Sequence, residues 1–311
     1  MTEEKKYELT EETIEVDGHV LHRIRALKNL WPYASVGDLG GFIEAKWNLS
    51  DKGNCWVGDD AKVYDSARVY DNAWIHDDAK IYEGSLVKDS ADVSGCAEIS
   101  GCALVSGNAT VYDAKVYDNA KVHDADINDE AQIYGHAEVI GENVYIFEEA
   151  RIFDYARVGS PTDHNIFVRN RVQIYGHARL GDFAVIIDDA KIYDHAWVHD
   201  ATVEDRAEVY GDAEVYDGAM IIDEAKVFDN AKVYGCATVE DRAEVYGDAE
   251  VYGDARVLDD AKVFGDARVF GRARIEDRAE VYDARVDAGI RICGNVKISS
   301  ESYHPDGIKI S

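Results

Sequence analysis

A six-residue repeat constrains the fold of this chain more than any other feature of its sequence. From Val57 onward an aliphatic residue recurs at every sixth position, and an alanine usually follows it four residues later. Amphipathic helices repeat their apolar residues at every third or fourth position, so this spacing excludes them. It fits three short strands per coil, with the aliphatic residue and the alanine facing inward. The repeat therefore predicts an all-β parallel solenoid (hexapeptide-repeat β-solenoid) of about 13 coils.

A longer repeat lies within the short one. The sequence T-V-E-D-R-A-E-V-Y-G-D-A-E-V-Y from Thr202 to Tyr216 recurs unchanged from Thr238 to Tyr252, an offset of 36 residues or two coils. One outward position alternates in charge from coil to coil, as Glu208, Lys226, Glu244, Lys262 and Glu280. Because like charges on adjacent strands repel each other, we expect the alternation to fix the register in which the coils stack.

The corners between strands have their own signature. Aspartate or glycine usually stands two positions after the aliphatic residue, as at Asp65, Asp71 and Gly95, and both tolerate the backbone angles of a tight corner. Four units are one residue short, those that begin at Val111, Val122, Val198 and Val281. We expect these to shorten a corner without moving the inward positions.

The two ends and one internal segment depart from the repeat. Residues 1–54 form the predicted N-terminal cap, with a β-hairpin around Asp17-Gly18. Trp31 and Trp47 in this segment, and Trp56 directly after it, offer large surfaces to bury. The parallel β-solenoid itself is predicted over residues 55–298, with a projecting loop at 159–167. Residues 299–311 are predicted to form a C-terminal cap or tail.

Composition excludes several functional classes. The formal net charge of −29 argues against direct nucleic-acid binding, which needs clustered Lys and Arg. No apolar run reaches the length of a membrane span, and the polar start does not resemble a signal peptide, so we expect a cytoplasmic protein with no membrane contact. The five cysteines show no C-x-x-C spacing and are expected to be free thiols.

The sequence resembles a known family at two levels. The unit Val209-Tyr210-Gly211-Asp212-Ala213-Glu214 resembles the hexapeptide repeat of the single-stranded left-handed parallel β-helix, and this resemblance alone implies the handedness. The early residues look like the YdcK-like family of bacterial and phage hexapeptide-repeat proteins, which carries an acyltransferase label by fold analogy. The motifs that carry this likeness are Gly37-Asp38-x-Gly40-Gly41-Phe42-Ile43-Glu44, Asn48-Leu49-Ser50 and Gly53-Asn54-Cys55-Trp56-Val57.

A column of aromatic residues is the first candidate functional surface. When every third unit is placed on one face, the position after the aliphatic residue is aromatic on nearly every coil. The column is either a stacking ladder that stabilises the sheet or a contact face for a second copy, a partner protein or a glycan. We predict a binding face formed by Tyr175, Tyr193, Tyr210, Phe228, Tyr246, Phe264 and Tyr282.

Three histidines are the candidate catalytic residues if the chain is an enzyme. One corner stacks His136, Tyr155, His177 and His195, with Asp154 and Asp194 beside them, and such a corner suits a metal or an acid–base pair. His164 lies in the predicted loop, and acyltransferases with the fold that the resemblance implies use a histidine as general base on a hydroxyl or amine that attacks an acyl-coenzyme A. We name His164, His177 and His195 as catalytic candidates and no metal ligands.

Three functions remain open from the sequence. The leading hypothesis is a non-catalytic scaffold or binding protein, without a cofactor, that contacts itself or a protein partner through the aromatic face. The first alternative is an acyltransferase that uses a coenzyme A thioester, although no basic cluster for the cofactor's phosphates is present. The second is an acidic nucleic-acid mimic that inhibits a host protein, with a solvated structural edge as the simpler interpretation of the same charges.

Overall fold

The computed structural model describes residues 5–159, 162, 164–287 and 289–299. These residues form an all-β parallel solenoid of about 14 turns in three parallel sheets, which confirms the predicted fold class. The count is one more than the predicted 13. Short units leave some coils with only 16 or 17 residues, as in the pairing of Thr110 with Asp126 and of Lys115 with Gln132. Left-handed winding stays a prediction from the resemblance.

No α-helix occurs within the described ranges, and none of the helical residues there could form a span across a membrane. The single helical turn among them is the 3-10 helix η1 (Lys46–Asn48). The chain divides into two compact units, Met1–Asp154 and Tyr155–Ser311, and each is described by itself.

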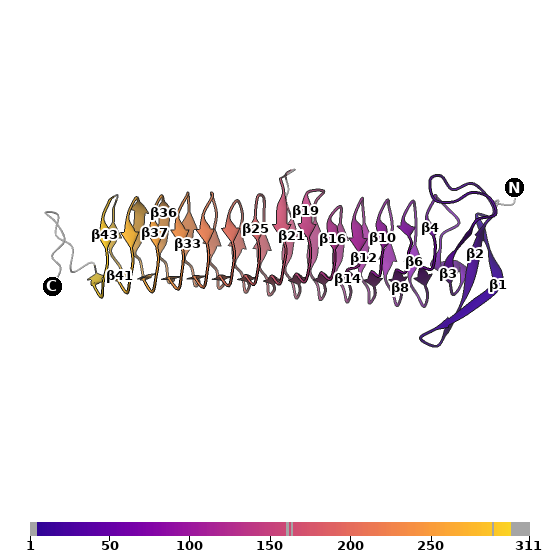
Figure 1. The fold of residues 1–311 in the computed structure, drawn as a ribbon, viewed down its shortest axis with the longest axis horizontal. Helices are drawn as coiled ribbons and strands as arrows, with labels where there is room; N and C mark the ends of the chain where they lie inside the picture. Colours follow the sequence, from indigo (N-terminus) through magenta and orange to yellow (C-terminus); the bar gives the residue numbers. More distant parts are fainter. Residues whose placement is uncertain (1–4, 160–161, 163, 288, 300–311) are drawn as a thin grey trace. The chain divides into compact units, whose positions relative to one another are not determined.

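The N-terminal unit begins with an antiparallel hairpin, drawn in indigo in Figure 1. Strand β1 (Tyr7–Val16) pairs with β2 (His19–Ala26), as Asp17-Gly18 predicted, and β2 pairs with β3 (Leu39–Ile43). Strand β3 also pairs in parallel with β5, and Leu49 forms a parallel bridge with Val69. The first coil therefore already contains residues from the segment predicted as cap.

The rest of the N-terminal unit consists of short parallel strands in three sheets. Its sheet A contains β5 (Lys62–Val63), β8 (Lys80–Ile81), β11 (Glu98–Ile99), β14 (Lys115–Val116), β17 (Gln132–Ile133) and β20 (Arg151–Ile152). Its sheet B contains β6 (Arg68–Val69), β9 (Leu86–Val87), β12 (Leu104–Ser106), β15 (Lys121–His123) and β18 (Glu138–Ile140). Its sheet C contains β4 (Trp56–Val57), β7 (Trp74–Ile75), β10 (Asp92–Ser94), β13 (Thr110–Tyr112), β16 (Asp126–Asn128) and β19 (Val144–Ile146).

The C-terminal unit repeats this plan, in the pink to yellow part of Figure 1. Its sheet A contains β23 (Gln173–Ile174), β26 (Lys191–Ile192), β29 (Glu208–Val209), β32 (Lys226–Val227), β35 (Glu244–Val245), β38 (Lys262–Phe264), β41 (Glu280–Tyr282) and β44 (Lys297–Ser299). Its sheet B contains β21 (Arg157–Gly159), β24 (Arg179–Leu180), β27 (Trp197–Val198), β30 (Glu214–Val215), β33 (Lys232–Tyr234), β36 (Glu250–Gly253), β39 (Arg268–Gly271) and β42 (Arg285–Val286). Its sheet C contains β22 (Ile166–Val168), β25 (Val185–Ile186), β28 (Thr202–Val203), β31 (Met220–Ile221), β34 (Thr238–Val239), β37 (Arg256–Val257), β40 (Arg274–Ile275) and β43 (Arg291–Ile292).

The predicted inward positions form the core of both units. The aliphatic residue and the alanine of a typical unit, such as Val209 and Ala213, have no exposed surface. The short units keep this arrangement, because Ala114 and Ala125 are equally buried. The prediction for the cap was wrong for two of its tryptophans: Trp56 is buried, but Trp31 and Trp47 are exposed. The Trp47 indole Nε1 instead donates a hydrogen bond to the Asp65 carbonyl oxygen at 3.0 Å.

A ladder of aspartates connects successive corners. After the five sheet C strands from β28 to β40, an aspartate with positive φ turns its carboxylate toward the next coil, whereas Asn170 follows β22 and Gly294 follows β43. Asp259 N–H donates to Asp241 Oδ2 at 3.1 Å, and Asp277 N–H donates to Asp259 Oδ2 at 2.9 Å. The same bond links Asp205 to Asp223 and Asp223 to Asp241. Each carboxylate therefore satisfies a backbone donor that the corner would otherwise leave to solvent.

At two of the units that are one residue short, the aspartate carboxylate bonds in the opposite direction. Asp113 Oδ1 accepts from the Cys96 N–H at 2.6 Å, and Asp283 Oδ1 accepts from the Asp266 N–H at 2.8 Å. Both donors lie on the preceding coil. A Cβ on Gly265, whose φ is +65°, would lie 2.1 Å from Asp283 Oδ1, so the corner beside this short unit needs glycine.

Substitution of one ladder aspartate tests this account of the corners. We expect Asp241→Ala to destabilise its coil by about 1–2 kcal/mol, because alanine disfavours the left-handed backbone and the Asp259 N–H loses its acceptor. Asp241→Gly keeps the corner and loses only the acceptor, so its effect should be smaller. Amide hydrogen exchange at Asp259 measures the loss directly and should accelerate in both variants.

The matched control is Asp212→Ala. Asp212 is an exposed corner residue whose φ is not positive. Unchanged exchange at Asp259 in Asp241→Gly would contradict the role assigned to the carboxylate.

Candidate functional site

The aromatic column of the C-terminal unit forms a continuous stack along sheet A. Tyr193 and Tyr210 have ring centroids 4.8 Å apart and planes 3° apart, and Phe228 follows Tyr210 at 4.9 Å. The stack starts at Tyr175 and continues through Tyr246 and Phe264 to Tyr282. The seven residues predicted as a binding face are therefore brought together as one ladder. Six of them are half-buried, and Tyr282 is exposed.

The stacking determines what this face offers to a partner. The face of each inner ring is covered by the rings of the neighbouring coils, so the ring edges remain for contact. The spacing of the rings follows the separation of adjacent strands, about 4.8 Å. The ladder consequently stabilises the sheet and also forms a flat strip of aromatic edges and hydroxyl groups.

A row of alternating charges lies beside the ladder. Glu208 is flanked by Lys191 at 3.5 Å and Lys226 at 3.7 Å, measured between nitrogen and carboxylate oxygen. Further along, Lys262 lies 2.7 Å from Glu244, and Lys297 lies 2.7 Å from Glu280. The strand pairing confirms the register that the alternation predicted, with Lys226 opposite Glu244 and Lys262 opposite Glu280.

The environment of the ladder changes the acidity of its phenols. Burial and the Glu208 carboxylate, whose Oε2 accepts a hydrogen bond from the Tyr193 hydroxyl at 3.3 Å, raise the pKa of Tyr193. Burial likewise raises the pKa of Tyr210 and Tyr246. Ionisation would place a negative charge in a partly buried position close to Glu208 or Glu244, so these rings stay neutral well above neutral pH.

The N-terminal unit has a shorter version of the ladder. Tyr64 stacks on Tyr82 at 5.3 Å, and Tyr117, Tyr134 and Phe153 form a second stack. The column position between the two stacks is Ser100. The Tyr64 hydroxyl donates to Asp17 Oδ2 at 2.8 Å, so the hairpin turn covers the first ring.

The acidic corner of the C-terminal unit forms an open groove of about 1110 Å³. Its inner row is the aspartate ladder, whose carboxylates accept backbone N–H groups. Its outer row alternates in charge: Arg242 Nε lies 2.7 Å from Asp260 Oδ1, and Arg206 pairs with Glu224. The hydrogen bond from Arg242 holds the pKa of Asp260 below its usual value. The carboxylates of this groove already have partners within the chain.

Two catalytic candidates, His177 and His195, lie together in the C-terminal unit. Their rings stack at 5.0 Å, and Tyr155 stacks on His177 at 5.1 Å. All three are exposed. The neighbouring Asp194 directs its Oδ2 to the Gly211 N–H at 3.3 Å, as a corner aspartate does. His136 belongs to the N-terminal unit.

The third candidate, His164, has a different set of contacts. Its Nδ1 lies 2.7 Å from Thr162 Oγ1 and 3.9 Å from Asp182 Oδ2, and its ring stacks on Phe183 at 4.0 Å. Of the predicted loop at 159–167, Gly159 lies in β21 and Ile166 begins β22, whereas residues 160, 161 and 163 lie outside the described residues. His164 is thus placed beside an aromatic ring and a hydroxyl group.

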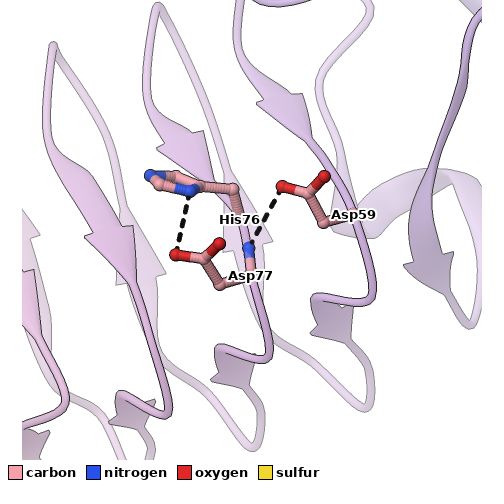
Figure 2. A group of neighbouring side chains, drawn as sticks. All are labelled: Asp59, His76 and Asp77. Carbon is pink, nitrogen blue, oxygen red and sulfur yellow. Dashed lines mark hydrogen bonds and ion pairs between the residues drawn. The ribbon is translucent and has the colours of Figure 1, made fainter.

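A histidine that the sequence did not single out has the densest set of carboxylates. His76, in the corner after β7, has its Nδ1 3.2 Å from Asp77 Oδ2 and its Nε2 3.0 Å from Asp92 Oδ1, and Asp59 lies on the preceding coil (Figure 2). Burial opposes protonation of the ring, but the hydrogen bond to Asp92 and the surrounding carboxylates raise the pKa of His76. The periodic sequence pattern does not reveal this group, because Asp92 and His76 occupy different positions of the six-residue repeat.

Two other clusters are already neutralised by their partners. Glu276 and Asp277 lie near Cys293, but Glu276 binds Arg274 and Arg291, and despite burial these arginines hold the pKa of Glu276 below its usual value. In the cap, the buried Lys6 Nζ donates to the Cys55 carbonyl oxygen at 2.8 Å and lies 3.0 Å from its Sγ.

Burial lowers the pKa of Lys6 and raises that of Cys55. The five cysteines are free, as predicted, with only Cys55 buried.

No family model matches this chain, and no curated protein matches it. The structure establishes the fold of this chain, a parallel β-solenoid of about 14 turns.

The raised pKa values in the ladder predict a loss of stability in alkali. A tyrosine whose pKa is higher in the folded state contributes stability in full below the unfolded pKa of about 10 and loses it as the pH rises toward the folded pKa. We expect the melting temperature to fall steeply between about pH 10 and 12. The triple variant Tyr193→Phe, Tyr210→Phe, Tyr246→Phe keeps the stack and removes three phenols, so its melting temperature should fall less.

Thermal unfolding monitored by circular dichroism at successive pH values tests this. Tyr155→Phe, outside the ladder, is the control and should behave as wild type. A triple variant with the same alkaline loss as wild type would show that the ladder phenols do not cause it.

Proposed function

We propose that this chain is a non-catalytic cytoplasmic scaffold that associates with a second copy of itself through sheet A of its C-terminal unit. The observation that carries the proposal is the pattern on that face: a continuous ladder of aromatic edges beside a row of strictly alternating charges. Aromatic residues are enriched at protein interfaces. Because the charges alternate, this surface can be complementary to the same surface of a second copy.

The symmetry of such a contact follows from the geometry of the face. Consider a two-fold axis parallel to the strands that passes between β32 and β35. It places the charge row of one copy against the charge row of the second, and the aromatic ladder of one against the aromatic ladder of the second. The two solenoids then run antiparallel. Each lysine then faces a glutamate of the second copy. The pairs across the axis are Lys226 with Glu244, Glu208 with Lys262, and Lys191 with Glu280.

The parallel arrangement lacks this complementarity. A two-fold axis along the solenoid would place the charge row of one copy on the aromatic ladder of the other. The lysines and glutamates would then lose water without gaining a partner of opposite charge, which costs free energy. The alternating row therefore favours the antiparallel dimer and disfavours the parallel one.

The size of the face indicates a weak, reversible contact. Six coils from Lys191 to Glu280 span about 24 Å at about 4.8 Å per strand. A strip of this length belongs to the small end of specific interfaces. The proposed assembly is consequently a dimer in exchange with its monomer.

The acyltransferase that the YdcK-like resemblance implies has less support from the geometry. A general base needs a group that orients it and a place for the substrate. His177 and His195 stack on each other, and the nearby Asp194 carboxylate accepts a backbone N–H. The groove that could hold a ligand is lined by carboxylates and ion-paired arginines, which suits the acidic phosphates of coenzyme A poorly.

Charge reversal across the proposed axis tests the dimer. Lys226→Glu and Glu244→Lys each place like charges face to face in a homodimer, so each variant alone should associate at least about 10-fold more weakly than wild type. An equimolar mixture restores every opposite pair across the axis and should form a heterodimer. Sedimentation velocity over a range of concentrations measures the homodimers, and native mass spectrometry identifies the mixed species.

The control is Lys232→Glu, which reverses a lysine in the equivalent position on sheet B, where it pairs with Glu214 at 3.1 Å. This variant should dimerise as wild type does. A monomeric wild-type chain at all concentrations would overturn the proposal, and so would single variants that dimerise normally. A mixture that stays monomeric while wild type dimerises would exclude the antiparallel register.

A further inference from the structure

We propose that His76, Asp77 and Asp59 of the N-terminal unit form a binding site for a divalent zinc ion. One imidazole nitrogen and one oxygen of each carboxylate lie within 4.8 Å of one another, in the two adjacent corners that follow β4 and β7 (Figure 2). Nitrogen from histidine and oxygen from aspartate are ligands that zinc accepts together. This site is separate from sheet A of the C-terminal unit and does not depend on the proposed dimer.

The distances require only a small closure around the ion. Zinc bonds of about 2.0–2.2 Å in a tetrahedral site place neighbouring ligand atoms about 3.3–3.5 Å apart. The separation of His76 Nδ1 and Asp77 Oδ2 is 3.2 Å, which already matches this value. Asp59 comes from the preceding coil, and one of its carboxylate oxygens lies within 4.8 Å of both other ligand atoms.

The carboxylates keep lone pairs for a ligand while they hold the corner, because each carboxylate oxygen has two. Asp59 Oδ2 accepts the Asp77 N–H at 3.3 Å, and Asp77 Oδ2 accepts the Gly95 N–H at 3.1 Å, as ladder aspartates do. The cations nearby are engaged by other carboxylates: Arg23 pairs with Asp60 at 3.0 Å and Lys62 with Asp78 at 3.6 Å. These two cations therefore leave the negative charges of the Asp59 and Asp77 carboxylates available to a metal ion.

The histidine is held in the orientation that a metal ligand needs. Asp92 Oδ1 lies 3.0 Å from His76 Nε2, so Asp92 can hold the Nε2 proton while an ion replaces the proton on Nδ1. A carboxylate on the far nitrogen is the usual partner of a histidine that binds zinc. The ring also stacks on Trp74 at 3.7 Å, and Trp74 stacks on Tyr33 at 5.2 Å. Packing and hydrogen bonding together fix the ring before an ion arrives.

A second copy of the same local sequence shows which part is specific. Trp74-Ile75-His76-Asp77 has a counterpart in Trp197-Val198-His199-Asp200, where His199 also stacks on its tryptophan, at 4.5 Å. On the next coil, however, His199 meets the ring of Tyr216 at 5.3 Å, whereas His76 meets Asp92. The described residues that could hold a metal include the His76 cluster and not the His199 one. The oriented imidazole, and not corner aspartates in general, distinguishes the site.

Three protein ligands leave a position open. Zinc sites with three protein ligands complete their coordination with water or an external group, whereas structural sites use four. Asp59 and Asp77 are exposed, so the open position faces solvent. The site would accordingly bind zinc reversibly and let an exogenous ligand reach it.

Titration of the full-length chain with zinc chloride tests the site. Isothermal calorimetry in excess magnesium, which occupies generic carboxylates, should show one zinc-binding event in the wild type. His76→Gln should abolish this event, and Asp92→Asn should weaken it by about 10–100-fold. Asp59→Asn and Asp77→Asn should also weaken zinc binding. Both keep a side-chain oxygen that can accept the backbone N–H of the next coil, and circular dichroism confirms that they fold.

His199→Gln is the matched control and should bind zinc as wild type does. Equal loss in His76→Gln and His199→Gln would show that binding is spread over the acidic surface and would overturn the proposal. Unchanged affinity in His76→Gln, or no zinc binding by the wild type, would overturn it as well. The state of association in these variants is a separate measurement and does not enter the result.

Discussion

The stacking of the coils depends, at many corners, on a hydrogen bond between the backbone N–H of one coil and an aspartate carboxylate of the neighbouring coil. The residue with positive φ stands two positions after a short strand, as Asp259 does after Val257, and its backbone N–H points along the stack toward the neighbouring coil. Aspartate adopts this backbone conformation more readily than most residues, and its carboxylate reaches the neighbouring donor, as Asp259 does for Asp277. Glycine can supply the conformation but not the acceptor.

The same bond explains much of the acidity of the chain. The net charge of −29 arises partly from aspartates that the corners need, and the arginines of the C-terminal groove neutralise some of the rest. A surface that imitated nucleic acid would present its carboxylates to a partner. Here Asp223 and Asp241 direct oxygens to backbone donors, so the charge is first a consequence of the fold.

The sequence predicted positions that repeat along one column and missed contacts that cross between columns. Inward residues such as Val209 and the ladder of Tyr193 and Tyr210 follow from a strict period, because each is a neighbour of its own equivalent one coil away. The contact of His76 with Asp92 joins different positions of the repeat and depends on side-chain rotamers. Trp31 and Trp47 were misjudged because large apolar area alone does not determine burial outside the periodic region.

The alternation of charge along sheet A limits how a chain of this kind can change its length. Loss of a single coil from the C-terminal unit would set Glu208 beside Glu244, or Lys226 beside Lys262, whereas loss of two adjacent coils leaves every lysine beside a glutamate. The identical segments at Thr202 and Thr238 are separated by two coils. Tandem duplication is therefore tolerated when it adds two coils at a time. A C-terminal unit that lengthens in this way keeps an even or an odd number of coils.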